Sequence, residues 1–430
     1  MTGNHTSVAV DDGGAGMQTP VRWLAPSEEM FVSMGAYVGY SVHIRGRLEL
    51  SALSDAFAVL RRTYPVLATR LVAMDGGHLI VAYSDTESGV GVCDDGVDEP
   101  MAGADLYPDK KVTAVHVARG GDGDRAVVTL LIHHSIADGH HGLALLADLW
   151  SLYTDITSGS VPAAVRHDYP ESVEKLFADR RIADFSYAEL PPCAAVRRFG
   201  TATNLQLPGF VSTFVRCRLS VAETAALLEL SHRCKVTMNS VVSAAIILTE
   251  SDVRRVRLCE IPYFITVDLR NRVTPPVEPT AGTNILGFAG FSASIDTTDD
   301  LVVVARAVAG QLSTELADGT VVKTALRPRQ FLTDLMSPAA PESVITTNWG
   351  RIPALRSPTG IEFTDFRAVF YNKPQEPHTL VPTQATGFHS YVISSFDERL
   401  SVELLVPNAT QLESARARVA SLEARLHSIG

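Results

Sequence analysis

The feature that most constrains this chain is an apolar run that ends in two histidines and the start of a helix. Residues 126–132 contain only Ala, Val, Thr, Leu and Ile, and they follow a turn-rich stretch at 120–124. This pattern is typical of a strand buried on both faces. The next seven residues, 133–139, are His-His-Ser-Ile-Ala-Asp-Gly, and apolar side chains then recur at helical spacing from 140 to 153. The pattern predicts a buried strand, a tight loop and a helix, with polar side chains held at the junction.

Only one of the two histidines is expected to face a cleft. Adjacent side chains on an extended segment point to opposite sides, so His133 and His134 must diverge. A histidine with its ordinary pKa of about 6.5 is largely neutral near neutral pH and can accept a proton. The sequence therefore predicts a single working histidine in this loop.

Composition and charge limit the class of protein. The 430 residues, 46% of them apolar, suffice for about two to three domains with substantial cores. The net charge of −11 argues against a nucleic-acid partner or an anionic membrane surface, since both attract a basic surface. We find neither a signal-peptide pattern nor an apolar run of about 18 residues, so we expect a cytoplasmic protein without a membrane span. The five cysteines are odd in number and lack Cys-x-x-Cys spacing, which predicts reduced thiols.

Periodicity and turn residues predict two lobes. Residues 1–20 are expected to form a disordered tail, 21–183 an N-terminal lobe with the histidine motif, 184–208 a connector and 209–430 a C-terminal lobe. In the first lobe we predict strands at 37–48, 69–72, 78–83, 112–117 and 126–132, and helices at 51–63 and 140–153. In the second lobe we predict strands at 213–219, 261–267 and 288–295, a hairpin of 391–396 with 400–406, and helices at 221–234, 239–254 and 299–316. Ser220 and Asn239 are the expected N-caps of the first two of these helices.

Several further segments accompany the motif in a fixed order: Pro26–Glu29, Leu53–Phe57, Pro65–Ala68, Asn239–Ala245, Val267–Arg270 and Thr283–Gly287. With His-His-x-x-x-Asp-Gly, they resemble the polyketide-associated acyltransferases of mycobacteria and related actinomycetes. That family lies within the superfamily of chloramphenicol acetyltransferase and the condensation domains of nonribosomal peptide synthetases. The resemblance spans roughly residues 20 to 410. It implies an α/β, chloramphenicol-acetyltransferase-like fold with two lobes, each a mixed sheet flanked by helices, and an active-site channel between them.

The resemblance also implies roles for the motif residues. It assigns His134 as the general base and His133 as a supporting residue. Asp138 could in principle orient the histidine, as a carboxylate does in a Ser-His-Asp triad. The resemblance instead implies that Asp138 pairs with an arginine, for which Arg270 is the matching residue. Gly139 is expected to supply backbone freedom.

Other candidates are weaker. Thr347 and Asn348 could donate hydrogen bonds to substrate beside Trp349, although a turn with a packed tryptophan explains the same residues as well. Asn284 is a further possible substrate-binding residue. We predict no metal site, because adjacent histidines diverge and no His-Glu-x-x-His pattern is present.

The resemblance implies an O-acyltransferase that moves an acyl group from a thioester to a hydroxyl of a polyketide- or lipid-type acceptor. The thioester, a co-substrate rather than a permanently bound cofactor, would be carried by coenzyme A or by the phosphopantetheine of a carrier protein or polyketide synthase. We expect a monomer. Two alternatives stay open: an amide-forming, condensation-type enzyme, and a non-catalytic module that docks a carrier protein. Acceptor identity and acyl chain length are open as well.

Overall fold

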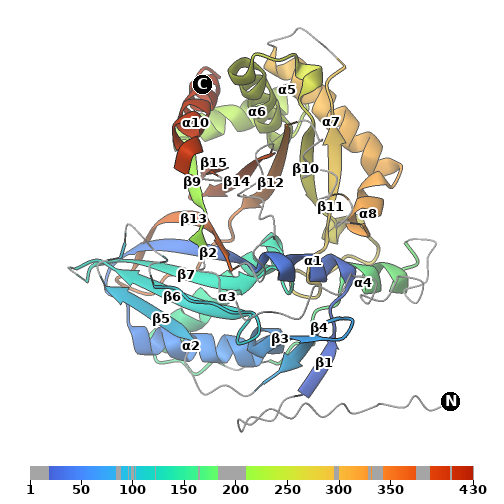
Figure 1. Ribbon diagram of the computed structural model, residues 1–430. Helices are drawn as coiled ribbons and strands as arrows, with labels where there is room; N and C mark the ends of the chain where they lie inside the picture. The colour runs from blue at the N-terminus through green and yellow to red at the C-terminus, as the bar shows by residue number, and fades with distance from the viewer. Residues whose placement is uncertain are drawn as a thin grey trace, which may run out of the picture.

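Two six-stranded sheets and one small sheet organise the protein (Figure 1). The computed structural model describes residues 19–83, 89–94, 96–97, 101, 103–121, 123–162, 165–182, 210–294, 300–327, 331, 342–373, 388–406 and 409–429. The expected connector, 184–208, and most of the expected tail, 1–20, lie outside these residues. Thr19 and Pro20 are an exception to the expected tail, because they belong to strand β1 (Thr19–Trp23) and pair with β4.

The first large sheet carries the histidine motif. Its strand order is β5 (Val90–Asp94), β6 (Thr113–Arg119), β7 (Arg125–His133), β2 (Ala36–Arg45), β13 (Glu362–Asn372) and β8 (Phe210–Val211). Helices α2 (Leu50–Thr63) and α3 (Gly139–Thr157) share a core with one face of this sheet. β7 is buried from Ala126 to His133, as expected for a strand covered on both faces.

The second large sheet forms the other half of the molecule. Its order is β11 (Leu286–Phe291), β10 (Tyr263–Asp268), β12 (Ser343–Arg351), β14 (Phe388–Phe396), β15 (Arg399–Val406) and β9 (Thr213–Arg218). The helices drawn around it in Figure 1 are α5 (Val221–Cys234), α6 (Met238–Arg254), α7 (Leu301–Ala317), α8 (Thr320–Ala325) and α10 (Leu412–His427). Their apolar residues and the inward strand positions make one core.

A small sheet and short helices lie beside the first sheet. The strand order is β1, β4 (Gly77–Ala82) and β3 (Thr69–Met74). Helices α1 (Pro26–Met34) and α4 (Val173–Asp179) and the 3-10 turns η1 (Pro65–Ala68), η4 (Leu258–Glu260), η5 (Arg270–Arg272) and η7 (Ala409–Gln411) complete the described elements. α1 contributes side chains to the site below.

The sheets do not follow the division of the chain at 184–208. β13 lies in the first sheet, where it pairs with β2 from Asn372 opposite Ala36 to Glu362 opposite Arg45. β8 joins the same sheet through β13. Residues after 209 therefore supply two strands to the sheet that carries the motif, and this connection ties the two halves together.

The sequence predicted the N-cap of one helix correctly and that of another incorrectly. Ser220 caps α5, as predicted, and the structure shows that it also forms a capping box with Glu223. For α6 the prediction of Asn239 as the cap is wrong: the Thr237 hydroxyl accepts from the backbone N–H of Ser240, and Asn239 lies inside the helix. Threonine at this position satisfies an N–H group that would otherwise lack a partner at the helix start.

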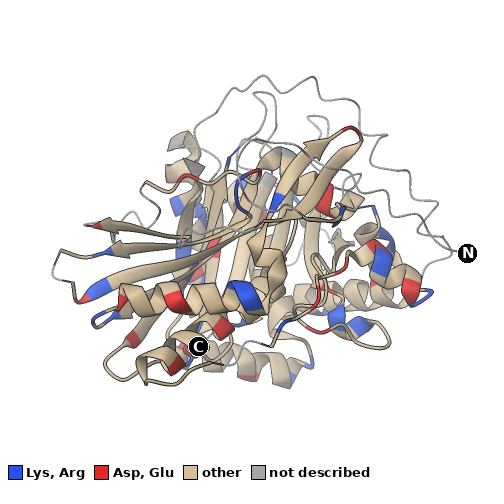
Figure 2. Ribbon diagram, turned by 90° about the horizontal axis from the view of Figure 1, so that it is seen from below, with Lys and Arg blue, Asp and Glu red and all other residues tan. Residues whose placement is uncertain are grey.

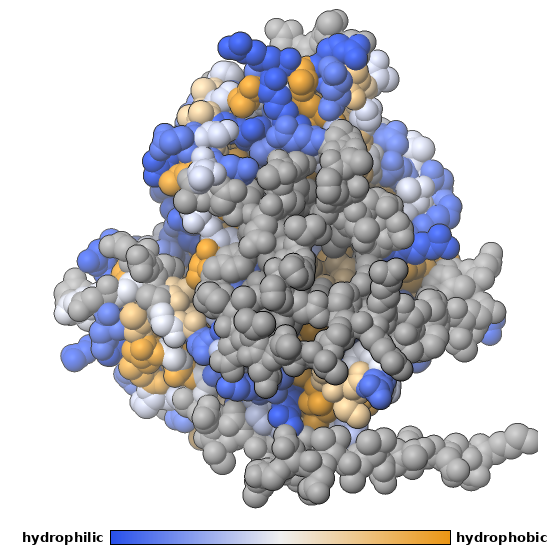
Figure 3. Space-filling model, in the orientation of Figure 1, coloured by the Kyte–Doolittle hydropathy of each residue, from blue (hydrophilic) through white to orange (hydrophobic). Residues whose placement is uncertain are grey.

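Charged residues are spread over the described surface. Figure 2 shows acidic and basic residues interspersed along the helices and strand ends of that side. On the face in Figure 3, the described hydrophobic residues form separate patches among hydrophilic ones. Among the described helices, none is long and apolar enough to cross a membrane.

Candidate active site

The two motif histidines point to different environments. β7 ends at His133 and α3 begins at Gly139, so the loop between them is only five residues long. His133 is fully buried, its ring meets Tyr37 edge-on, and its Nδ1 accepts from the backbone N–H of Ser135. Burial lowers the pKa of His133 to about 3. His133 is therefore a neutral, structural side chain at ordinary pH.

His134 lies against α1 and against the segment before β11. Its ring stacks on Phe31 with centroids 3.9 Å apart and planes 2° from parallel. Its Nδ1 is 3.1 Å from Oδ1 of Asn284, and Nδ2 of Asn284 donates to the backbone carbonyl of His134 at 2.8 Å. Burial is the largest influence on the pKa of His134 and lowers it, while the hydrogen bond with Asn284 acts in the opposite direction. The imidazole is thus held neutral at ordinary pH.

These two hydrogen bonds determine which ring nitrogen carries the proton. A carbonyl oxygen only accepts, so the amide nitrogen of Asn284 must face the His134 carbonyl. Oδ1 of Asn284 then faces Nδ1, and because Oδ1 also only accepts, Nδ1 must donate. In the neutral ring the proton is therefore on Nδ1, and Nε2 carries the free lone pair. The ring is oriented to accept a proton through Nε2.

Asp138 is committed to a buried ion pair. Its Oδ2 lies 2.8 Å from Nη1 of Arg270, and both side chains are 3% exposed. The carboxylate also accepts from the backbone N–H groups of Ile285 and His141, the latter as the N-cap of α3. Burial alone would raise the pKa of Asp138, but the charge and hydrogen bond of Arg270 outweigh burial and lower the pKa. The carboxylate thus anchors the loop, and its described hydrogen bonds give no triad with His134.

The segment 281–285 joins this anchor to the rest of the site. Its Thr283 carbonyl accepts from the backbone N–H of Asp138, and its Thr283 hydroxyl donates to the buried carboxylate of Glu28 in α1. The Gly282 carbonyl accepts from Nη2 of Arg270 and is 3.1 Å from Nδ1 of His141. The segment therefore positions Asn284 against His134. Sequence reasoning missed this role of Glu28 and Thr283, although both lie in the segments that carry the resemblance.

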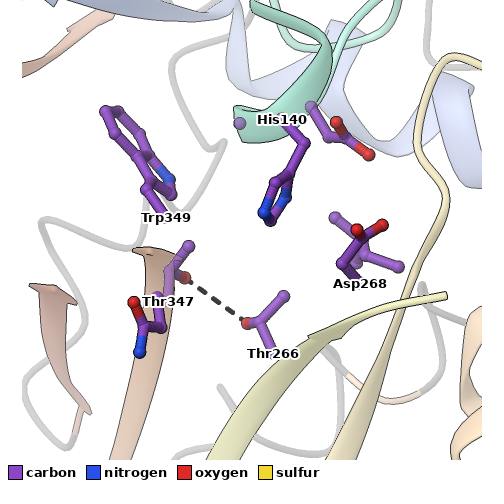
Figure 4. Close-up of a pocket in the computed structure, with 9 residues that line it drawn as sticks. His140, Thr266, Asp268, Thr347 and Trp349 are labelled. Carbon is purple, nitrogen blue, oxygen red and sulfur yellow. Dashed lines mark hydrogen bonds between the residues drawn. The ribbon is translucent and has the colours of Figure 1, made fainter. Parts of the chain in front are cut away.

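A pocket opens beside the start of α3 (Figure 4). His140 lies between Trp349 on one side and Asp268 on the other, above the hydroxyls of Thr266 and Thr347, which are 3.4 Å apart. His134 is not among the lining residues, which are Asp138, Gly139, His140, Thr266, Asp268, Leu286, Thr347, Asn348 and Trp349. His140, Thr266 and Asp268 were missed as site residues. The parallel pairing of β10 with β12, which the sequence does not reveal, places Thr266 opposite Thr347.

The three candidates on β12 have different positions. Thr347 lines the pocket with its hydroxyl near that of Thr266. Asn348 also borders the pocket, but its Nδ2 donates to Oδ1 of Asn239 and its Oδ1 accepts from the backbone N–H of Gly350. Trp349 is buried and packs against Tyr40 with ring centroids 5.2 Å apart. For Asn348 and Trp349, these contacts support the other explanation that the sequence left open, a turn with a packed tryptophan.

Gly139 is required for space and not for backbone freedom. The φ angle of Gly139 is not positive, so the expectation that this glycine supplies backbone freedom is wrong. A Cβ at this position would lie 2.7 Å from Nε1 of Trp349. Glycine allows α3 to begin directly against the indole ring.

Within the described residues, no group of three or more His, Cys, Asp or Glu side chains is placed to hold a metal ion. Three of the described cysteines are free thiols, namely Cys93, Cys217 and Cys234. Cys193 lies outside the described residues.

Comparison with known proteins identifies the fold and the family. The structure of polyketide synthase associated protein 5 from Mycobacterium tuberculosis aligns with a TM-score of 0.77 and 28% identity, covering 96% of this chain and 98% of that one. The first condensation domain of the calcium-dependent antibiotic synthetase aligns with a TM-score of 0.62 and 15% identity, covering 94% of this chain and 96% of that one. The protein therefore has the two-lobed, condensation-domain-like acyltransferase fold that the resemblance implied.

The sequence places it further. Residues 208–405 match the family described as "Phthiocerol/phthiodiolone dimycocerosyl transferase C-terminus". The phthiocerol/phthiodiolone dimycocerosyl transferase of Mycobacterium tuberculosis (strain ATCC 25618 / H37Rv) is 34% identical over 373 residues, 82% of this chain and 86% of that protein. The chain thus belongs to the polyketide-associated acyltransferase family of phthiocerol/phthiodiolone dimycocerosyl transferases, and it is an acyltransferase.

Proposed function

We propose that the protein is an O-acyltransferase that moves an acyl group from a coenzyme A or carrier-protein thioester to a hydroxyl of a polyketide- or lipid-type acceptor. Family membership supports the acyl transfer, because the relatives are named as dimycocerosyl transferases acting on phthiocerol or phthiodiolone. The geometry of His134 supports the choice of base. The product is an ester and a free thiol.

The observation that carries the mechanism is the orientation of the His134 ring by Asn284. With the proton on Nδ1, Nε2 takes the proton of the acceptor hydroxyl while its oxygen attacks the thioester carbonyl. The new C–O bond forms, the C–S bond breaks, and the imidazolium returns the proton to the departing thiolate. The lowered pKa of His134 keeps the ring neutral and ready to accept. Because the thioester is already activated, no covalent acyl-enzyme is needed, and positioning of both substrates contributes to the rate.

The proposal is tested by measuring free thiol released from an acyl-coenzyme A or acyl-carrier thioester with and without an alcohol acceptor. We expect release that depends on the acceptor, with an ester found by mass spectrometry. Faster release with an amine of matched chain, and an amide product, would support the condensation-type alternative. Absence of release with every acceptor, alongside binding of the carrier protein, would support the docking module.

A second prediction concerns Asn284 as a positioning residue. Asn284→Leu should lower kcat by about tenfold or more, because Nδ1 loses the acceptor that selects the productive tautomer. The hydrogen bond with Asn284 raises the pKa of His134, so its loss should also move the acidic limb of the kcat/KM profile to lower pH. The measurement is thiol release across pH.

Two further variants distinguish a positioning role of Asn284 from a general loss of protein stability. Asn284→Asp keeps an acceptor for Nδ1 and adds a negative charge, so its acidic limb should move to higher pH. Asn372→Leu removes another buried asparagine, which ends β13 and whose amide donates to the hydroxyl of Ser212, and it should leave the limb in place. A limb that stays unchanged in Asn284→Leu would contradict the role of Asn284.

A further inference from the structure

Glu28 of α1 contacts both the loop that carries the proposed base and the segment that orients it. Its backbone carbonyl accepts from the hydroxyl of Ser135, the residue after His134, at 2.8 Å. Its carboxylate accepts from the hydroxyl of Thr283, the residue before Asn284, at 2.7 Å. A single residue of α1 therefore links the base to the partner that places its proton.

Four donors converge on the two carboxylate oxygens of Glu28. The side chain is fully buried. Oε1 accepts from Nη2 of Arg22 and from Thr283, and Oε2 accepts from Nη1 of Arg22 and from the backbone N–H of Ala25. Two carboxylate oxygens offer about four lone-pair sites, so the described donors use all of them. A glutamine amide would turn N–H groups toward some of these donors, and the position therefore requires a carboxylate.

Asn284 and Phe31 then fix the imidazole ring itself. Asn284 makes the two hydrogen bonds that place the proton on Nδ1 of His134. Phe31 lies about one helical turn after Glu28 in α1 and covers a face of the same ring. A shift of α1 against the segment of Asn284 would change both contacts at once. The hydrogen bond between Glu28 and Thr283 opposes such a shift.

We propose that Glu28 is a positioning residue for acyl transfer, which holds His134 in its proton-accepting orientation through Thr283 and Ser135. The inference rests on the proposed function and adds to it a residue that acts through its neighbours. The reaction needs the Nε2 lone pair aimed at the acceptor hydroxyl, and small errors in such an alignment are costly in rate. The loss should therefore appear in kcat, with KM for the thioester nearly unchanged.

The test uses Thr283→Val, which removes the hydroxyl and keeps the size of the side chain. The backbone of Thr283 is paired with Asp138 and Glu171, so the segment should stay folded. Thr283→Val should lower kcat for thiol release by about tenfold, and Thr283→Ser, which keeps a hydroxyl, should retain most of the wild-type kcat. Thr69→Val is the matched control, because its equally buried hydroxyl donates to the Val66 carbonyl in η1. It should leave kcat unchanged.

A double-mutant cycle distinguishes positioning from a general structural role. Because Thr283 acts through Asn284, adding Thr283→Val to Asn284→Leu should lower kcat by less than about a further twofold. Losses that multiply in the double variant would contradict the inference.

Nitrogen-15 NMR of histidine-labelled protein follows the ring without catalysis. Wild type should show the Nδ1–H tautomer for His134, assigned with His134→Ala, and both Thr283→Val and Glu28→Gln should show a mixture of the two tautomers. Thermal melting identifies the variants that are folded. A pure Nδ1–H tautomer in folded Thr283→Val would overturn the inference. Failure of the proposed function has a different signature, no thiol release by wild type with any acceptor, and the NMR spectra then decide the inference alone.

Discussion

Replacing His134 by alanine is expected to lower kcat for acceptor-dependent thiol release by a factor of about 10² to 10⁴, the usual contribution of a general base. The reason is the single lone pair that Asn284 leaves on Nε2. KM for the thioester should change much less, since the base acts on the acceptor proton. Steady-state kinetics at a pH above the acidic limb measure both constants.

His133 provides the matched control at the neighbouring position. Its ring is buried and accepts from the N–H of Ser135. The main effect of His133→Asn should therefore be a lower thermal midpoint, with a smaller effect on kcat of the folded fraction. The two variants thus separate chemistry from folding within one loop. Near-normal transfer by His134→Ala would remove the basis for the mechanism.

Elements with strong local signals were predictable from sequence. α5 has the predicted bounds, 221–234, because an amphipathic repeat follows a Ser220–Glu223 capping box. The hairpin of β14 and β15 was located by its turn, in which Asp397 and Glu398 adopt positive φ angles. Such signals lie within a few residues of the structure that they determine, so a single sequence is sufficient to find them.

β13 shows why other elements escaped prediction. It carries Asp365 and Arg367 in its interior, which weakens the apolar pattern of a strand. The structure neutralises these charges with distant partners: Arg216 lies 2.5 Å from Asp365, and Glu403 lies 2.6 Å from Arg367. Partners more than 30 residues away are set by tertiary packing, which local periodicity does not contain.

The features of the site also divide into those that local sequence signals predict and those that depend on tertiary packing. The motif located the loop, and the diverging directions of His133 and His134 followed from strand geometry. The partners of the loop did not follow from spacing: Asn284 was considered for substrate binding, yet its amide holds a histidine 150 positions earlier in the chain. Gly139 likewise owes its identity to Trp349, which reaches it from β12. Contacts between remote segments decide these roles.

The second large effect is expected for the ion pair of Asp138 and Arg270. Asp138→Ala should lower the free energy of unfolding by about 3 to 5 kcal/mol, because it leaves a buried guanidinium without its main partner. It also leaves the backbone N–H groups of Ile285 and His141 without the carboxylate that accepts from them. Urea unfolding measures the loss. Lys175→Ala, which breaks an exposed pair with Asp179, is the control and should change stability little.

A double-mutant cycle distinguishes the ion pair from its surroundings. Asp138→Asn combined with Arg270→Met removes both charges. The double variant should therefore lose less free energy of unfolding than the two single variants lose in sum. The pair lowers the folded-state pKa of Asp138, so the stability it supplies is present above the ordinary pKa of an aspartate and is lost as pH falls through the lowered pKa. The double variant should therefore lose less stability on acidification than wild type. Additive single losses, together with an unchanged acid response, would mean that the pair does not anchor the loop and that the backbone hydrogen bonds of the 281–285 segment hold it instead.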